Sequence, residues 1–294
     1  MAESAGSAVP DERQFAVPTS KSLAGRTMIM SGGSRGIGLA IAVRAARDGA
    51  NIALIAKTDT ADSRLPGTIH TAAAEIEAAG GHALPILGDI RDDDTVANAV
   101  ERTVEKFGGI DIVVNNASAI TLQNIGDLPA KRYDLMLDIN ARGTFALTSL
   151  ALPHLLRSSN AHVLTLSPPL NMDRKWLQYH APYTISKYAM TMLTLGVAES
   201  QRDAGVAANC LWPRTLIATA AVQNLLGGEA SMTGSRTPEI VADAAYEILV
   251  RPSRECTGNT FVDDDVLREA GITDLSKYRF GPGNDDDLAL DIFL

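Results

Sequence analysis

The sequence predicts an α/β fold in which one doubly wound, seven-stranded parallel sheet carries helices on both faces. Short runs of Val, Ile and Leu alternate along the chain with longer segments of helical period. The short runs are apolar throughout, which indicates strands that are buried on both faces of a parallel sheet. Right-handed crossovers between such strands build a doubly wound sheet.

The first half of the chain alternates regularly. We predict strands at 27–30, 51–56, 83–87 and 111–114, and helices at 37–48, 68–79 and 95–107. Glycine pairs at 80–81 and 108–109 are helix stop signals. The first 20 residues are rich in Ser, Ala, Pro and acidic residues, so we expect a flexible tail there.

The second half continues the pattern with longer helices. A helix is expected at 131–156, although Gly143 and Pro153 interrupt its pattern, and another at 182–202. Strands are predicted at 162–166, 206–211 and 260–262. We therefore expect residues 21–294 to form a single domain with a C-terminal extension.

Composition narrows the class of function. Apolar residues make up 46% of the 294 residues, as in ordinary globular domains, and the net charge is −9. An acidic surface disfavours nucleic acid and anionic membranes as partners. The chain has no apolar run of about 18 residues and no secretory signal pattern, so we expect a cytoplasmic protein. The two cysteines and five histidines lack metal-ligand spacing, and no metal is predicted.

A glycine-rich loop, SGGSRGIG, follows the first predicted strand and opens the first helix. Gly32, Gly33, Gly36 and Gly38 let the backbone approach a pyrophosphate, which the N–H groups of the helix start then bind. Such a loop between a buried strand and a helix predicts dinucleotide binding.

The end of the second strand indicates which dinucleotide binds. An NAD site usually has an acidic residue there, whereas this chain has Lys57, with Arg35 in the glycine loop. Two cations favour the 2′-phosphate of NADP(H). An ordinary exposed lysine is the alternative, and Asp59 and Asp62 leave NAD open. Asp89 and Ile90, after the third strand, are candidates for contacts with adenine.

Tyr183 and Lys187 are four residues apart in a predicted helix, which puts both side chains on one face. A free tyrosine has a pKa near ~10, too high for a base at neutral pH. A neighbouring ammonium group lowers that pKa, so the two side chains can act together in proton transfer.

The motifs SGGSRGIG, Asp89-Ile90, NNAS at 115–118, Asn140 in INARG and YTISK at 183–187 occur in an order that resembles the short-chain dehydrogenase/reductase family. The resemblance covers about residues 21–262 and implies a Rossmann-like fold. LSPPLN at 166–171, LWPRT at 211–215 and the late FVDDDVL stretch are similar to the hydroxysteroid-dehydrogenase-like subgroup.

The resemblance implies roles for individual residues. Tyr183 would be the acid/base, Lys187 its activating partner, Ser167 a hydrogen-bond donor to the substrate oxygen, and Asn140 the holder of a linking water. Cofactor contacts are expected from Gly32, Gly33, Ser34, Arg35, Gly36, Ile37, Gly38, Lys57, Asp89, Ile90, Asn116, Ala117, Tyr183, Lys187, Pro213 and Thr215.

Three positions and one spacing depart from the usual family pattern. Ser31 replaces a threonine, Ser118 stands where glycine is commonest, and Arg214 follows Pro213 in place of glycine. The spacing from Ser167 to Tyr183 is a few residues longer than usual. Ser167 therefore has a second interpretation, as the start of the turn at Pro168-Pro169.

Aromatic and aliphatic residues surround the predicted site in sequence. Leu170, Met172, Trp176, Leu177 and Tyr179 precede Tyr183, and Trp212 and Leu216 follow the sixth strand. They indicate an apolar carbonyl or alcohol substrate of steroid-like, fatty or aromatic type; a role in the core or in a subunit contact is the alternative. Residues 218–236, rich in glycine, resemble a lid.

We thus expect an NADP(H)-dependent oxidoreductase that forms a homodimer or homotetramer through its two long helices. The alternatives are a catalytically weak dinucleotide-binding sensor or scaffold, and an epimerase or lyase.

Overall fold

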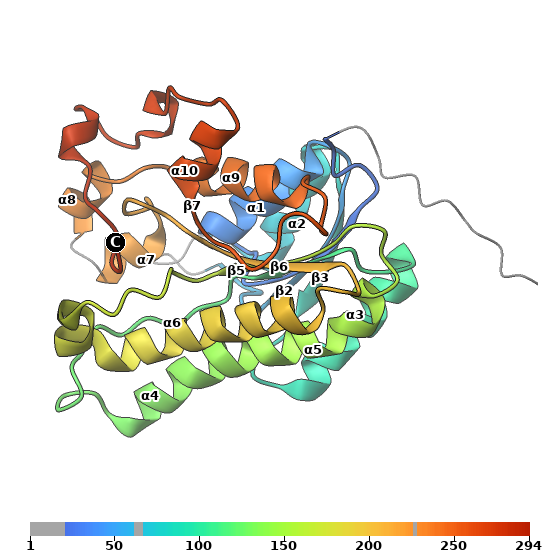
Figure 1. Cartoon of the computed structure of the whole chain (residues 1–294), viewed down its shortest axis with the longest axis horizontal. Coiled ribbons are helices and arrows are strands. Elements are labelled where there is room, and N and C mark those ends of the chain that lie inside the picture. The colour runs from blue at the N-terminus through green and yellow to red at the C-terminus, as the bar shows by residue number, and fades with distance from the viewer. Residues whose placement is uncertain (1–20, 62–66, 226–227) are drawn as a thin grey trace, which may run out of the picture.

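The computed structural model describes residues 21–61, 67–225 and 228–294. The predicted tail at 1–20 and Asp62 lie outside the described residues. Seven strands form one sheet in the order β3-β2-β1-β4-β5-β6-β7, and every neighbouring pair is parallel. The predicted doubly wound α/β fold is confirmed (Figure 1).

The strands lie close to their predicted places. They are β1 (Thr27–Ser31), β2 (Asn51–Ala56), β3 (His82–Leu87), β4 (Ile112–Asn115), β5 (Ala161–Leu166), β6 (Val206–Trp212) and β7 (Thr260–Val262). The helices are α1 (Gly36–Ala46), α2 (Ile69–Ala78), α3 (Asp93–Phe107), α4 (Ala130–Leu137), α5 (Gly143–Leu155), α6 (Arg174–Ser200), α7 (Ala220–Leu225), α8 (Gly228–Thr233), α9 (Glu239–Leu249) and α10 (Asp263–Glu269).

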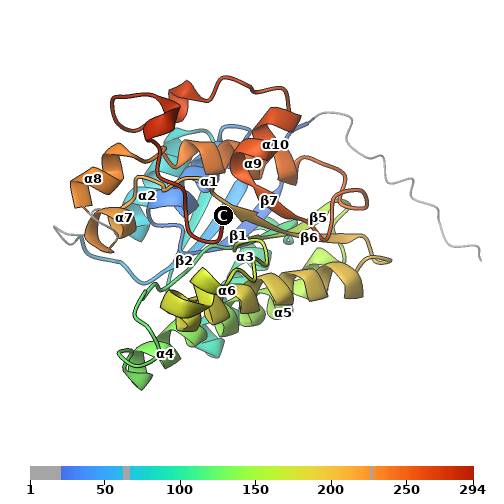
Figure 2. The same cartoon turned by 60° about the vertical axis from the view of Figure 1, so that its left-hand side comes forward.

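Two helical layers enclose the sheet. Helices α1, α2, α9 and α10 cover one face, and α3, α5 and α6 cover the other (Figures 1 and 2). Met30 of β1 points into the first layer and packs with Ile41 and Ile248, whereas its neighbour Ile29 points into the second and packs with Leu147. Because successive side chains point to opposite faces, a strand between two apolar layers must be apolar throughout.

Two long helices differ from their predictions in an informative way. The predicted helix at 131–156 is helical from α4 to α5, but one π-helical turn, Asp138–Arg142, interrupts it. Helix α6 begins at Arg174, eight residues earlier than predicted, and bends at His180, which has non-helical backbone angles. Pro182 lacks a backbone N–H, and in a regular helix its ring would clash with the carbonyl of Gln178 four residues earlier, which accounts for the bend.

The last residues of the chain return across the carboxyl ends of the strands. We call residues 288–294 the C-terminal segment. Leu216 N–H donates to Ala289 O (2.9 Å) and Asp291 N–H donates to Arg214 O (2.9 Å), so the segment runs beside the chain that follows β6. Thr215 pairs with Leu290 in an antiparallel bridge. This contact carries the segment to the edge of the sheet where the predicted site residues lie.

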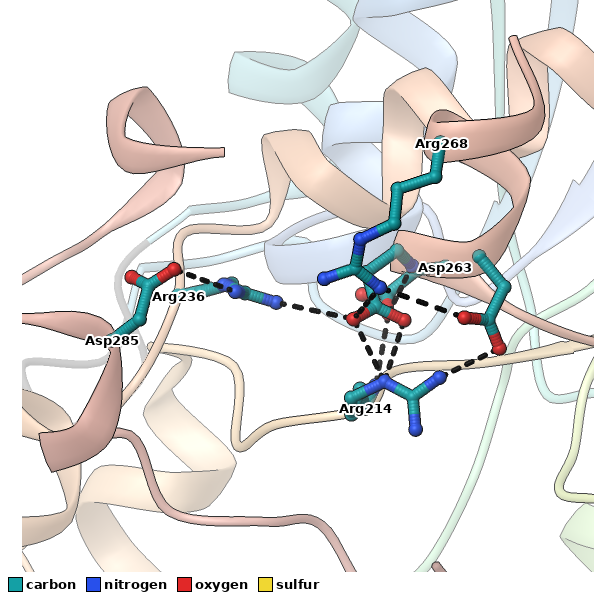
Figure 3. Close-up of polar contacts among 7 residues, drawn as sticks. Arg214, Arg236, Asp263, Arg268 and Asp285 are labelled. Carbon is teal, nitrogen blue, oxygen red and sulfur yellow. Dashed lines mark hydrogen bonds and ion pairs between the residues drawn. The ribbon is translucent and has the colours of Figure 1, made fainter. Parts of the chain in front are cut away.

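A buried carboxylate links the start of α10 to the chain after β6. Asp264 is 1% exposed and accepts from Arg214 Nε (2.6 Å) and from Arg268 Nη1 (2.8 Å) (Figure 3). Arg236 lies 3.9 Å from the same carboxylate and 3.6 Å from Asp285. Arg214 stands where the family that the sequence resembles commonly has glycine. Its side chain forms the ion pair with Asp264, which a glycine could not form.

Among the described residues, no helix is long and apolar enough to cross a membrane. Cys210 and Cys256 are both free and buried.

Candidate active site

The candidate site lies at the carboxyl ends of β1, β4, β5 and β6. The sheet order reverses between β1 and β4, because β2 and β3 lie on one side of β1 while β4 and β5 lie on the other. Loops diverge at such a point and leave a crevice in which ligands of doubly wound sheets bind. The glycine loop, the NNAS loop and the start of the Tyr183 helix all meet there.

The glycine loop has the backbone that a dinucleotide requires. Gly32 has φ +73°, and a Cβ there would lie 2.8 Å from the Cα of Ala117. A Cβ on Gly38 would lie 2.5 Å from Nδ2 of Asn116. Within the described part of the chain, no side chain caps the start of helix α1, and its first turn has no acidic residue that would repel a phosphate at this helix end. These residues therefore fit a nicotinamide dinucleotide.

The loop after β4 is held at both ends. At its start, Asn116 and Ala117 donate their backbone N–H groups to the Ser31 hydroxyl, at 3.2 and 3.1 Å. At its end, Asn140 accepts from Ala119 N–H (2.7 Å) and donates to Ala119 O (3.0 Å). The hydroxyl that Ser31 shares with the usual threonine thus has a structural use, and Ser118 lies between the two anchors.

Asn140 lies in the π-helical turn and is fully buried. Besides its contacts with Ala119, its amide donates to the Ser186 hydroxyl (3.0 Å), which in turn donates to Tyr183 O (2.8 Å). The side chain thereby joins the loop after β4 to the helix that carries Tyr183. Asn140 thus lies at the site, where its hydrogen bonds hold the loop after β4 against α6.

Tyr183 and Lys187 lie side by side on α6, as their spacing predicts. Lys187 is 2% exposed, and its Nζ donates to Leu166 O (2.7 Å) and to the Ser118 hydroxyl (3.4 Å). The ammonium group also lies 5.1 Å from the centre of the Trp212 ring. The lysine is therefore fixed by the ends of β4, β5 and β6 together.

Burial shifts the pKa values of three titratable groups at this site. It raises the pKa of Tyr183 well above its usual value, and nearby Asp291 adds to the rise, whereas hydrogen bonding with Ser118 opposes it. Burial lowers the pKa of Lys187 to about 7, against the attraction of Asp291. Burial also raises the pKa of Asp291 to about 7. All three charged forms are disfavoured because water is excluded from the site.

Ser167, the predicted hydrogen-bond donor, lies deeper than Tyr183. It is fully buried just after β5, and its hydroxyl has no partner of regular hydrogen-bond geometry among the described residues. The side chain faces Cys210, whose pKa it lowers against the larger effect of burial. The role of Ser167 as a donor to the substrate oxygen therefore stays a prediction.

The C-terminal segment covers Tyr183, a contact that the sequence does not predict. Phe293 is fully buried, and its ring stacks on Tyr183 with centroids 6.0 Å apart and packs against Trp176 and Tyr188. Tyr183 is consequently only 4% exposed. Asn171 donates to Phe293 O (2.9 Å), which fixes the segment from the loop after β5. In the sequence, the one local indication of this contact is that the last three residues, Ile292 to Leu294, are all apolar.

The cations expected at the cofactor phosphate have partners already. Lys57 lies 3.1 Å from Asp89, and Arg91 lies 2.5 Å from the same carboxylate. Both hold the pKa of Asp89 well below its usual value. Arg35 donates to Gly67 O (3.0 Å), while its Nε is buried without a partner among the residues that the structure describes. Lys57 and Asp89 are thus paired at the ends of β2 and β3, and Arg35 is held in the glycine loop by the chain before α2.

The other predicted contact residues line the same edge. Ser34 and Ile37 lie in the glycine loop. Ile90 packs closely against Gly143, because a Cβ added to this glycine would lie 2.9 Å from the Ile90 side chain. Pro213 and Thr215 follow β6, and Thr215 is 3% exposed beside the C-terminal segment. The segment predicted as a lid contains α7 and α8, and Thr219 before them lies 3.3 Å from where a Cβ on Gly36 would be.

Comparison with known proteins agrees with this geometry. The model of the short chain dehydrogenase family matches residues 26–229. The chain belongs to the short-chain dehydrogenase family. The resemblance seen in the sequence motifs is thereby confirmed.

Relatives in this family cover nearly the whole chain. Hydroxysteroid dehydrogenase-like protein 2 of Xenopus tropicalis is 50% identical over 278 residues; these are 95% of this chain and 66% of that protein, so the chain spans slightly less than two thirds of the relative. A putative dehydrogenase from Xanthomonas campestris is 51% identical, with a TM-score of 0.89 over 93% of this chain and 99% of that one. A short chain dehydrogenase from Mycobacterium thermoresistibile is 59% identical, with a TM-score of 0.87 over 93% and 96%.

Proposed function

We propose that this short-chain dehydrogenase interconverts a carbonyl and an alcohol on an apolar small molecule and uses NADP(H). The observation that carries the proposal is the placement of Tyr183 and Lys187 beside a glycine loop that fits a dinucleotide. A hydroxysteroid dehydrogenase-like relative at 50% identity supports the same class of reaction.

In the direction of reduction, Tyr183 gives its proton to the carbonyl oxygen. A bound nicotinamide supplies the hydride that the carbonyl carbon accepts. Lys187 stabilises the phenolate that remains, because its ammonium group lies on the same helix face one turn away. The buried surroundings strengthen this interaction, since charges attract more strongly where water is excluded. In oxidation the same proton returns from the alcohol to Tyr183.

The rings around Tyr183 support an apolar substrate. Trp176, Tyr188, Trp212 and Phe293 form one cluster with Tyr183, and an aromatic wall of this kind binds steroid-like, fatty or aromatic compounds better than charged ones. A polar substrate would lose its hydration there without gaining partners.

Two measurements test this function. Titration of the protein with NADPH and with NADH gives the cofactor preference, and a panel of apolar ketones and aldehydes, followed by loss of nicotinamide absorbance, gives the reaction. We expect tighter binding of NADPH and turnover of at least one bulky apolar carbonyl. Tighter binding of NADH, or reduction of small polar carbonyls alone, would contradict the proposal.

The cofactor preference has a matched set of variants. Replacing Arg35 or Lys57 by Ala removes a cation beside the expected 2′-phosphate, so NADPH affinity falls about 10–100-fold, as for a lost charge-assisted hydrogen bond. NADH affinity stays nearly unchanged, because NADH lacks this phosphate. The exposed Lys131, replaced by Ala, serves as control. An equal loss of affinity for NADPH and NADH would show that these cations do not bind the 2′-phosphate.

One observation supports a second candidate, a dinucleotide-binding sensor or scaffold. Tyr183 is 4% exposed beneath Phe293, so in this conformation a substrate has little access to its hydroxyl group. A sensor would bind NADPH yet leave it unoxidised by every carbonyl of the panel. An epimerase or lyase would consume its substrate without net oxidation of NADPH. Loss of nicotinamide absorbance therefore distinguishes the oxidoreductase from the other two functions, and chromatography of the substrate distinguishes an epimerase or lyase from a sensor.

We further propose that the protein forms a homodimer or homotetramer through α5 and α6. Large apolar side chains are exposed on these helices: Phe145 and Leu150 on α5, Ile185 and Met192 on α6. Apolar groups gathered on one surface are typical of contact sites. Phe145→Glu should lower the mass measured by light scattering to that of a smaller assembly. Ile125→Glu, at an exposed loop residue, should leave the mass unchanged; an unchanged mass in both variants would contradict this interface.

A further inference from the structure

Two serines lie near the Tyr183–Lys187 pair, and they differ in exposure. Ser167 is fully buried after β5 and faces the Cys210 thiol. Ser118 is exposed, and it lies in the loop after β4 that opens on the cofactor crevice. Of the two, only Ser118 therefore has a side chain at the surface that a substrate and a cofactor reach.

The Ser118 hydroxyl contacts Lys187 and lies beside the proton-transfer pair. It accepts a hydrogen bond from Lys187 Nζ at 3.4 Å. The same hydroxyl opposes the rise in the pKa of the Tyr183 phenol that burial causes, and Tyr183 lies one helical turn before Lys187 on α6. A hydroxyl group has one donor and two acceptor positions, so it can accept from the lysine while it donates to the tyrosine oxygen.

The backbone on both sides of Ser118 is fixed. Ala117 N–H donates to the Ser31 hydroxyl (3.1 Å), and Ala119 exchanges two hydrogen bonds with the buried Asn140. Residues held in this way keep their side chains in one place, which a group acting in proton transfer needs. Asn140 thus acts on the site through the loop that presents Ser118.

We propose that Ser118 is the positioning residue of this site, whose hydroxyl joins Lys187 to Tyr183 and takes the place that the family resemblance assigns to Ser167. The proposal rests on the proposed function. When Tyr183 gives its proton to the substrate oxygen, the Ser118 hydroxyl donates to the phenolate that remains. No atom of Ser118 is gained or lost in the reaction.

The test compares Ser118→Ala, Ser118→Thr and Ser167→Ala with the wild-type enzyme, and uses Ser200→Ala at the exposed end of α6 as the neutral control. Thermal unfolding first shows that each variant is folded. We expect Ser118→Ala to lower kcat about tenfold, the usual effect of one lost hydrogen bond. Ser118→Thr keeps a hydroxyl and should recover most of this loss.

The pH profile distinguishes a positioning role from a merely structural one. Because the serine hydroxyl favours the phenolate, its loss raises the pKa of Tyr183, so the profile of kcat/KM in the alcohol-oxidation direction moves to higher pH. We expect a shift of about 0.5–1 pH unit for Ser118→Ala. A larger loss of kcat in Ser167→Ala, or a Ser118→Ala variant that changes only the KM for NADPH, would overturn the proposal.

One readout does not depend on turnover. The absorbance of tyrosinate is titrated in the wild type and in Tyr183→Phe, and their difference reports the phenol of Tyr183. The same difference in a Ser118→Ala background should move to higher pH. If this shift occurs while the wild type reduces no carbonyl, the proposed function fails and the role of Ser118 stands. If the wild type turns over and the titration does not move, only the Ser118 proposal fails.

Discussion

Tyr183→Phe should lower kcat for carbonyl reduction by about 10²–10⁴-fold, the range over which a positioned general acid acts. The substitution removes one hydroxyl and keeps the ring, so the stacking with Phe293 and the rest of the aromatic cluster remain. The phenol is the proposed proton donor to the substrate oxygen, and the adjacent Lys187 has its own partners in Leu166 and Ser118. NADPH binding should therefore be nearly unchanged.

Steady-state kinetics with the best carbonyl of the panel measure this loss, and fluorescence titration with NADPH measures binding. Tyr246→Phe is the matched control, since Tyr246 lies on α9 and bonds to Lys21 O and Asp48, away from the crevice. A Tyr183→Phe enzyme that keeps wild-type turnover would exclude Tyr183 as the acid. A large loss of NADPH binding would instead indicate that the ring positions the cofactor.

The fold was predictable because its signals are local. A strand such as 51–56 is apolar at nearly every position, and this alone indicates burial on two faces. The glycine loop marks the end of β1 and the start of α1, so the place of the cofactor crevice follows as well. The bend at His180 was less accessible, because Pro182 restricts the preceding residues without fixing where the earlier helix begins.

The site was predictable to the extent that its residues are neighbours in sequence. Tyr183 and Lys187 share a helix face at four-residue spacing, and this brings them together in any helical conformation. The partners of Lys187 come from the ends of β4 and β5, which only the tertiary fold brings near α6. The exposure of Ser118 and the burial of Ser167 depend on such long-range packing, so the motif spacing alone did not distinguish them.

The contact of Phe293 with Tyr183 is the feature of the site that is hardest to predict from the sequence. It lies more than 100 residues from Tyr183, and an apolar ending has no period from which a contact can be inferred. In the structure its ring fills the space among Tyr183, Trp176 and Tyr188, and Trp212 Nε1 donates to the preceding carbonyl of Ile292 (3.0 Å). The C-terminal segment thus covers Tyr183 and also forms part of the apolar cluster around it.

Phe293→Ala should lower the free energy of unfolding by about 3–5 kcal/mol, as for other buried phenylalanines replaced by alanine. The substitution leaves a cavity against Tyr183, and loss of the segment's contacts would also free the hydrogen bonds of Leu216 and Asp291. Urea unfolding measures the stability, and hydrogen exchange at these two amides shows whether the segment detaches. Phe280→Ala, at a phenylalanine that is 53% exposed, should change stability by less than about 0.5 kcal/mol.

The same variant separates the two roles of the segment. If Phe293 limits the space beside Tyr183, its removal should raise kcat/KM for bulky apolar carbonyls relative to small ones, because the pocket gains the volume of a ring. If the ring serves only stability, both substrates should lose activity in proportion to the fraction of unfolded protein. Unchanged stability together with unchanged substrate preference would mean that Phe293 does not rest on Tyr183 in solution.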